Sequence, residues 1–310
     1  MKVIAFAGRK LGGAVLVLWL VATAIFAGIR LIPGDPAEAI MGGPGSQASA
    51  EALAAARAEY GLDRPVFMQY LLFLGKLARL DFGTSYSLKQ PVTSIIGEVL
   101  PPTLALALAA LVAAWLLALL FALASLRAGK FAAQLGSLLE IIAAAVPHFW
   151  LGAVLIMVFS TALGWLPAVA NDSAAGMVLP VLTLALPLAG FLAQLMRDSL
   201  AGALSSQFAL AARVRGESQL KLFFRHGLRH AALPVLGMTG WAFSSLLSGA
   251  VVVEAVFARP GLGRALLSAV LARDIPMVTG IALFSAAAYI IVMALTEAIE
   301  RLVNPAGAEA

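Results

Sequence analysis

The chain is 310 residues long, 62% hydrophobic and 12% charged, with a mean hydropathy of +0.96. This composition is far more apolar than that of a soluble globular domain and indicates lipid as the solvent. The net charge of +5 does not indicate a nucleic-acid partner, because the basic residues stand in short segments beside apolar runs. The chain contains no cysteine, which excludes disulfides, a thiol nucleophile and thiolate metal sites.

Six apolar windows are long enough to cross a bilayer as helices. Crossing the ~30 Å hydrocarbon layer takes about 20 mostly apolar residues, and a helix satisfies its own backbone groups there. The windows are bounded by charge, Pro or Gly and cover residues 11–31, 103–126, 138–163, 177–196, 233–253 and 278–298. The sequence therefore predicts an all-α polytopic membrane protein in which residues 1–310 form a single membrane domain.

The first window follows a basic start, as the apolar core of a secretory signal peptide does. It exceeds the usual ~7–15 residues of such a core, so an uncleaved first span is the preferred interpretation, although cleavage after the Ala-rich stretch stays open. Six spans place both ends of the chain on one side of the membrane. The basic residues of the short ends and loops predict that this side is the cytoplasm.

Residues 32–102 are predicted to form an external segment between the first two spans. It opens with a Pro- and Gly-rich loop signal at residues 33–36 and 42–45. Residues 51–60 are Ala-rich and charged and precede Gly61, while residues 66–80 repeat their apolar positions near the helical period. We expect short helices lying near the membrane surface.

Residues 197–232 form a long basic loop on the predicted cytoplasmic side. Ser205 or Ser206 is placed to cap a helix, Gly216 to supply its left-handed end, and Gln219 to begin a second helix. Such a knob outside the bilayer suits docking to a partner. A solvated basic loop held near anionic lipid is the alternative.

The small side chains of Ala209, Ala211 and Ala212 would let a partner approach this knob closely, and Arg213 and Arg215 would reach polar groups at the rim of the contact.

Two ionisable residues fall at membrane depth and are candidates for function. His148 lies inside the third window, where it is interpreted as a substrate contact or proton relay, or as a neutral histidine bonded to a carbonyl freed by Pro147. Glu254 lies at the outer end of the fifth window and either anchors the outer loop or touches substrate. Glu140 and Asp198, near the inner ends of spans, are explained by snorkelling, capping or pairing with Arg197.

The loop sequence A-A-R-V-R-G-E-S, followed by H-G-L-R-H-A-A-L-P-V-L, resembles the coupling loop of bacterial ABC importer permeases of the dipeptide, oligopeptide and nickel class. The resemblance covers nearly the whole chain. It includes R-L-I-P-G-D-P-A, L-D-F-G-T-S-Y, P-H-F-W-L-G and V-V-V-E-A-V-F-A-R-P-G-L-G-R, in that order. The order and spacing together make the match specific for the binding-protein-dependent inner-membrane components.

This resemblance implies a role for two sets of residues. The set that contacts an ATPase subunit comprises Phe208, Ala211, Ala212, Arg213, Arg215, Gly216 and Glu217. The outer-loop motif comprises Glu254, Pro260, Gly261, Gly263 and Arg264. Apart from the resemblance, His148 is a possible pathway residue because it lies inside the third window. The chain departs from the family pattern at Phe208, where Tyr is frequent, at Glu217, where an apolar residue is common, and at His230, where Asn is frequent.

The resemblance also implies a multi-pass protein of the bacterial inner membrane that works with a second homologous permease, two cytoplasmic ABC ATPase subunits and an extracytoplasmic solute-binding protein. The sequence contains no G-x-x-x-x-G-K-[ST] run, so ATP and Mg are expected on the ATPase partners and not on this chain. No catalytic residue, cofactor or metal ligand is expected. Short peptides are the expected cargo, with nickel or a metal chelate as the alternative and an ion-coupled carrier as the rival class.

Overall fold

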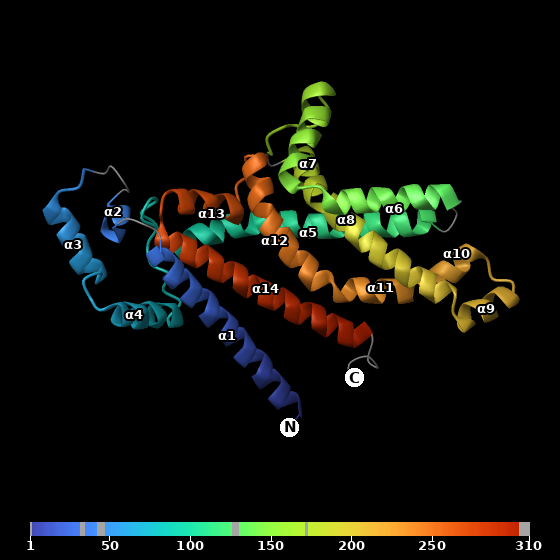
Figure 1. Cartoon of the computed structure of the whole chain (residues 1–310), viewed down its shortest axis with the longest axis horizontal. Helices are drawn as coiled ribbons and strands as arrows, with labels where there is room; N and C mark the ends of the chain where they lie inside the picture. Colours follow the sequence, from blue (N-terminus) through green and yellow to red (C-terminus); the bar gives the residue numbers. More distant parts are fainter. Residues whose placement is uncertain (1, 32–34, 42–46, 126–129, 171–172, 304–310) are drawn as a thin grey trace. The chain divides into compact units, whose positions relative to one another are not determined.

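The chain folds into helices, and no β-strand occurs in the part that this computed structural model describes, residues 2–31, 35–41, 47–125, 130–170 and 173–303 (Figure 1). The first half contains α1 (Lys2–Leu31), α2 (Pro36–Ile40), α3 (Ala50–Tyr60), α4 (Val66–Ala78), α5 (Val92–Ser125), α6 (Lys130–Ala145), α7 (His148–Leu155) and the π-helix η1 (Ile156–Ala162). The second half contains α8 (Ala174–Leu204), α9 (Gln207–Val214), α10 (Gln219–Leu222), the π-helix η2 (Phe223–Gly227), α11 (Leu228–Gly237), α12 (Thr239–Val256), α13 (Leu262–Leu271) and α14 (Ile275–Val303).

Five of these helices are long and apolar enough to cross a membrane. They contain the segments Lys10–Leu31, Val92–Ala124, Ala174–Leu204, Thr239–Val256 and Ile275–Ile299. A sixth crossing is supplied if the bent pair Gln134–Ala145 and His148–Ala162 counts as one span. The prediction of an all-α polytopic membrane protein with about six spans is confirmed, and α2, α3 and α4 form the predicted helical insertion between the first two spans.

The third predicted span is broken at Pro147. The two halves of the bent pair meet at 107°, and Pro147 stands between them with an extended backbone as the N-cap of α7. Proline has no N–H to continue the helix of the preceding turn, and its ring disfavours a helical conformation in the residue before it. The sequence identified the proline but not the size of the bend.

Parts of the predicted segments lie outside the described residues: residue 126 at the end of the second window, and residues 32–34 and 42–46 of the external segment. The fifth window, residues 233–253, is divided at Met238 between α11 and α12. Helix α13 was not predicted.

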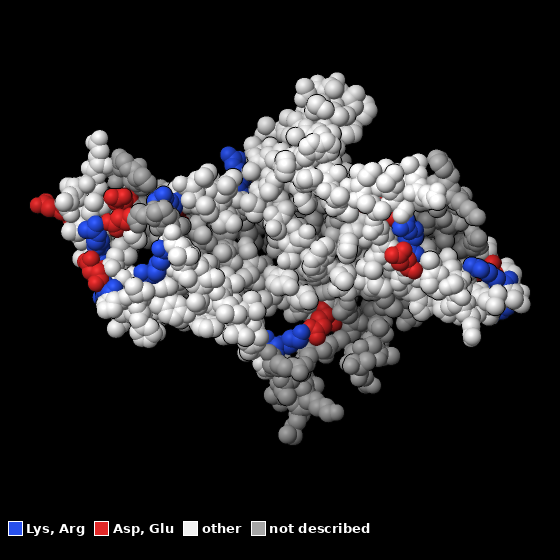
Figure 2. Space-filling model, viewed as in Figure 1, with Lys and Arg blue, Asp and Glu red and all other residues white. Residues whose placement is uncertain are grey.

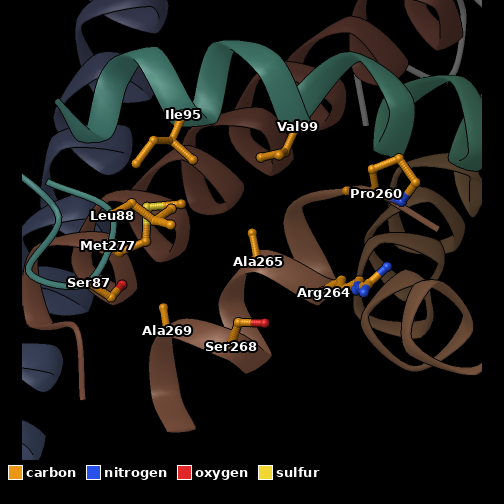
Figure 3. A pocket seen from close by; sticks show the side chains of 11 residues that line it. Ser87, Leu88, Ile95, Val99, Pro260, Arg264, Ala265, Ser268, Ala269 and Met277 are labelled. Carbon is orange, nitrogen blue, oxygen red and sulfur yellow. The ribbon is translucent and has the colours of Figure 1, made fainter. Parts of the chain in front are cut away.

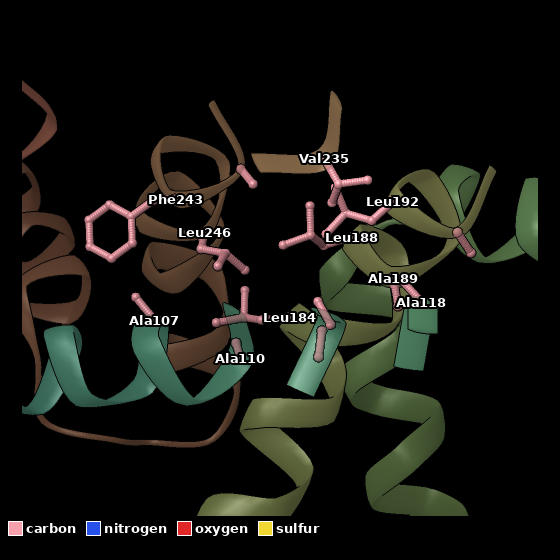
Figure 4. Close-up of a cluster of buried hydrophobic side chains, with 14 of the residues drawn as sticks. Ala107, Ala110, Ala118, Leu184, Leu188, Ala189, Leu192, Val235, Phe243 and Leu246 are labelled. Atoms are coloured by element: carbon pink, nitrogen blue, oxygen red, sulfur yellow. The ribbon is translucent and has the colours of Figure 1, made fainter. Parts of the chain in front are cut away.

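The helices group into two compact units. Unit 1 comprises Met1–Pro101 and Pro260–Ile290, and unit 2 comprises Pro102–Arg259 and Ile291–Ala310. The core of unit 2 is built from buried alanines along one face of α5, spaced three or four residues apart as at Ala107, Ala110 and Ala114. Figure 4 shows leucines of α8 and α12 packed with these small side chains. Small residues let membrane helices approach closely, which supplies packing where lipid gives no hydrophobic drive.

Helices α6 and α8 of unit 2 touch at backbone distance. A Cβ atom added at Gly190 of α8 would stand 2.5 Å from the backbone oxygen of Glu140 in α6. No real Cβ contact is that short, so only glycine permits this approach. The first half of the broken span is therefore packed firmly against α8.

Unit 1 has its own smaller core. Val92, Ile95 and Ile96 of α5 pack with residues of α13 and with Met277 and Ile281 of α14. In the segment between the first two spans, Ser49 caps α3 through its hydroxyl, and Gly61 ends the helix with φ +65°. Asp35 is paired with Arg57, and a hydrogen bond from the backbone of Ala37, together with that pair, lowers the pKa of Asp35.

Candidate functional site

The α9 segment, residues 205–222, is a short helix, a glycine turn and the start of a second helix. Ser206 accepts a hydrogen bond from the N–H of Ala209 and so caps α9, as one of the two predicted serines. The helix ends at Val214, and Gly216 follows with φ +81°, the left-handed conformation that the sequence predicted. Chain direction then reverses into α10, which begins at Gln219.

The inner side of the α9 segment is a small apolar core. Ala209 and Ala212 are fully buried and cluster with Leu222 of α10. The segment is also tied to its neighbours, because the ring of Phe208 stacks on that of His230 in α11 with centroids 5.0 Å apart. These contacts make the segment a rigid projection of unit 2.

The outer side of the segment exposes apolar side chains. Leu210 is 62% exposed and Val214 is 82% exposed, and at spacing i, i+4 they share one face of the helix. Ala211, Arg213 and Arg215 are also exposed, whereas Ala209 and Ala212 face inward and are inaccessible. The sequence predicted that small alanine side chains would form the contact surface. In the structure the exposed apolar surface is formed by Leu210 and Val214.

Charge is concentrated at this end of unit 2. Figure 2 shows charged side chains over α9 and α10, whereas long stretches of the spanning helices in the same view are white. Arg215 approaches Glu217 at 3.9 Å, and the Glu217 side chain is only 10% exposed. An apolar ridge bordered by arginines is suited to a groove with an acidic or polar rim.

The α9 segment is joined to α8 by close packing. A Cβ atom on Gly227 of η2 would stand 2.9 Å from Leu200 of α8, so η2 lies directly against the end of that helix. The carbonyl of His230 accepts a hydrogen bond of 3.4 Å from Ser199. The α9 segment is therefore packed against the end of α8, and α8 in turn packs against α6 at Gly190.

His148 begins α7 at the break in the third span. Its imidazole lies next to Leu184 of α8 and Gly249 of α12, since a Cβ on Gly249 would be 3.3 Å from His148 Nε2. The carbonyl of Pro147 accepts from the N–H of Leu151 and so belongs to the first turn of α7. Within the described part of the chain His148 has no hydrogen-bond partner, so the bonded-histidine interpretation has no support.

Glu254 is fully buried near the end of α12. The hydroxyl of Thr103, at the start of the membrane part of α5, donates to its Oε1 at 2.5 Å. The backbone oxygen of Glu254 accepts from the N–H of Arg259 at 2.9 Å and so fixes the turn after the helix. The sequence predicted an anchoring role for Glu254 but missed Thr103, which is far away in the chain.

The rest of the outer-loop motif lies in unit 1, where Pro260, Gly261 and Arg264 line a cavity of about 320 Å³. Figure 3 shows Pro260 and Arg264 on one side of this cavity, and Ile95, Val99 and Met277 around its apolar wall. Gly261 precedes α13 and is buried together with Gly263. The motif therefore positions α13 against the start of α5 and lines a mostly apolar cavity.

Two family models cover almost the entire chain. Residues 110–306 match the binding-protein-dependent transport system inner membrane component, and residues 3–107 match the N-terminal part of such membrane components. The chain is 35% identical to the glutathione transport system permease protein GsiC of Salmonella paratyphi A over 299 residues, covering 96% of this chain and 97% of that protein. It is also 35% identical to GsiC of Escherichia coli K12 over 306 residues, with the same coverage.

A polytopic helical protein with a rigid projection outside its spans is the class that fold and site define. The family matches go further. The chain belongs to the inner-membrane permeases of binding-protein-dependent ABC importers. It is thus a multi-pass inner-membrane protein that works with ATPase, binding-protein and permease partners.

Proposed function

We propose that this chain forms half of the translocation pathway of an importer for short peptides, with a glutathione-like tripeptide as the first candidate cargo. The observation that carries the cargo is the 35% identity with glutathione permeases over 96% of the chain. The second half of the pathway is a homologous permease. Two ABC ATPases in the cytoplasm supply the energy and an extracytoplasmic binding protein delivers the cargo, so both termini and the α9 segment face the cytoplasm.

The α9 segment is proposed as the contact with the ATPase subunit. Its support is the exposed ridge of Leu210 and Val214 on a projection whose inner side is held by Leu222 and by the stack on His230. Phe208, Ala211, Arg213, Arg215 and Glu217 complete the proposed contact, while Ala212 and Gly216 maintain its shape.

The proposed mechanism is alternating access. Closure of the ATPases on ATP moves α9, and the close contact of η2 with α8 transmits this movement to the spans. Because α8 contacts α6 at Gly190, a movement of α8 also moves α6 and the break at Pro147, which precedes His148. A ligand drives such a change only if it interacts differently with the two states, so α9 must stay bound to its ATPase throughout.

The test is purification followed by transport. The tagged chain is isolated from its host in mild detergent, its companions are identified by mass spectrometry, and the complex is reconstituted in proteoliposomes with its binding protein. We expect ATP-dependent uptake of radiolabelled glutathione that is competed by trialanine and not by nickel. Uptake of nickel alone would replace the peptide assignment by a metal cargo. Recovery of the chain alone after crosslinking would contradict the proposed assembly.

A further inference from the structure

A second cavity in unit 1, of about 400 Å³, lies between α4, the loop that follows it and the first turn of α14. It differs from the cavity of the outer-loop motif in that its lining is largely polar and aromatic. The residues that matter for its chemistry are Tyr60, Lys76, Asp81, Phe82, Tyr86 and Thr279.

The loop that forms one wall of this cavity is held in place. The carboxylate of Asp274, directly before α14, is fully buried and accepts from the hydroxyl of Ser85 at 2.5 Å and from the N–H and hydroxyl of Ser87 at 3.0 and 2.8 Å. The N–H of Val92 donates to the carbonyl of Gly83 at 3.0 Å and closes the base of the loop. The wall is therefore formed before any ligand arrives.

Thr279 supplies a buried hydroxyl without a partner. The residue is 3% exposed, and its Oγ1 makes no hydrogen bond within the described structure. Other helical threonines of this chain, such as Thr183 and Thr296, donate to the carbonyl four residues earlier. A buried polar group left unpaired is costly, so the Thr279 hydroxyl on the wall of a cavity indicates a polar molecule that pairs with it.

The cavity also carries two opposite charges that do not neutralise one another. Lys76 makes no ion pair among the described residues, and Asp81 uses one oxygen to accept from the N–H of Gly83 at 2.9 Å. The rings of Tyr60 and Tyr86 meet edge to face, with centroids 6.0 Å apart. Aromatic faces together with a carboxylate are the surroundings that an ammonium group prefers, and a lysine ammonium binds phosphate or carboxylate.

We propose that this cavity binds a small zwitterion, with its ammonium group beside Tyr60, Tyr86 and Asp81 and its phosphate or carboxylate beside Lys76. The hydroxyl of Thr279 completes the site from the α14 side. Burial raises the pKa of the Tyr86 phenol, so this phenol stays neutral and keeps its proton to donate. The inference does not depend on the cargo of the importer.

Two sources supply this chemistry. The candidate span begins at Ile275, so Thr279 stands one turn inside it, at the level where a spanning helix meets the lipid headgroups. A phosphatidylethanolamine headgroup carries an ammonium and a phosphate. A dissolved amino acid or short peptide carries an ammonium and a carboxylate. Both present one ammonium group and one anionic group.

The test is equilibrium binding to the purified chain after lipid removal, with O-phosphoethanolamine, dialanine, ethanolamine and inorganic phosphate as separate probes. We expect a zwitterion to bind and each half-molecule to bind at least tenfold more weakly. Native mass spectrometry from nanodiscs of phosphatidylethanolamine or phosphatidylglycerol gives the lipid arm. Retention of phosphatidylethanolamine with binding of O-phosphoethanolamine assigns a headgroup, and binding of dialanine alone assigns a dissolved zwitterion.

Two variants locate the probe. Thr279→Val keeps the volume and removes an unpaired hydroxyl, so it should fold normally and weaken binding roughly fivefold, the value of one hydrogen bond. Lys76→Met should abolish selection for the anionic group. Thr183→Val is the matched control, because the Thr183 hydroxyl is buried but bonded within its own helix. Absence of binding, or binding that Thr279→Val and Lys76→Met leave unchanged, would overturn the proposal and leave the cavity to water.

Discussion

Glu140 of α6 and Arg197 of α8 form an ion pair in which Glu140 Oε2 lies 2.8 Å from Arg197 Nη1. The Glu140 side chain is 4% exposed, and Arg197 also donates to the hydroxyl of Ser137 at 3.2 Å. The pair joins the first half of the broken span to the helix that leads into the α9 segment. The ion pair is thus a second contact between α6 and α8, in addition to the backbone contact at Gly190.

Removing one partner of this pair is expected to destabilise the protein strongly. Glu140→Ala leaves the guanidinium of Arg197 without its carboxylate in a mostly buried place, which costs about 3–5 kcal/mol. The measurement is the unfolding midpoint of the purified chain in detergent. Arg215→Ala is the control, since it removes a 3.9 Å contact to an arginine that is 62% exposed and should change stability by less than ~1 kcal/mol. Equal midpoints for the two variants would contradict the ion pair.

The turn at Gly216 is expected to be essential for coupling. Its φ of +81° disfavours any side chain by roughly 1–2 kcal/mol, although the surrounding space is open. Gly216→Val should therefore displace α10 from α9 and leave ATP hydrolysis by the assembled complex uncoupled from import. The measurement is the ratio of cargo imported to ATP hydrolysed in proteoliposomes.

Gly202→Val provides the comparison for Gly216→Val. Gly202 is exposed in α8, has open space around it and has no positive φ. The same side chain added there should leave the ratio of import to hydrolysis unchanged. Normal coupling in the Gly216→Val complex would refute the assignment of the α9 segment as the ATPase contact.

Local signals made the α9 segment predictable from the sequence. A serine that caps and a glycine that ends a helix act within a few residues, so Ser206 and Gly216 were placed correctly. Which side of α9 faces the protein depends on Leu222, in the next helix, and was not predictable. Phe208 and His230 were predicted as two independent departures from the family pattern. In the structure their rings stack on each other.

Long-range contacts account for what the sequence missed. Thr103 and Glu254 meet in space although they are 151 residues apart in the chain. Helix α13 lies between two spans and has 10 residues, which is too short for a hydropathy window that detects membrane spans. From its position in the sequence, Glu140 was explained equally by snorkelling, capping or pairing with Arg197. The structure shows the pair with Arg197, which forms where α6 and α8 approach closely near Gly190.

The exposed ridge of α9 gives a prediction about assembly. Val214→Asp places a charge on a side chain that is 82% exposed, so the chain itself should fold as before. If the ridge enters a groove of the ATPase, a buried unpaired carboxylate should cost several kcal/mol and abolish co-purification of that subunit. Leu271→Asp, at a residue 77% exposed in α13, is the control and should keep the ATPase. Loss of the ATPase in both variants would mean that the effect is not specific to α9.

Asp274 gives a prediction about pH. Burial raises the pKa of Asp274, but hydrogen bonds from Ser85 and Ser87 lower it further than burial raises it, so the pKa lies below the usual 3.8. A carboxyl group with a lowered pKa in the folded state stabilises the fold above its unfolded pKa and loses that contribution as the pH falls through the folded value. The loop of Ser85 and Ser87 should therefore become sensitive to an acid protease only below about pH 3.8. Asp274→Asn should be cleaved there at every pH tested, because a neutral amide accepts these bonds more weakly. Loosening of the wild-type loop already at pH 6 would show that another group holds it.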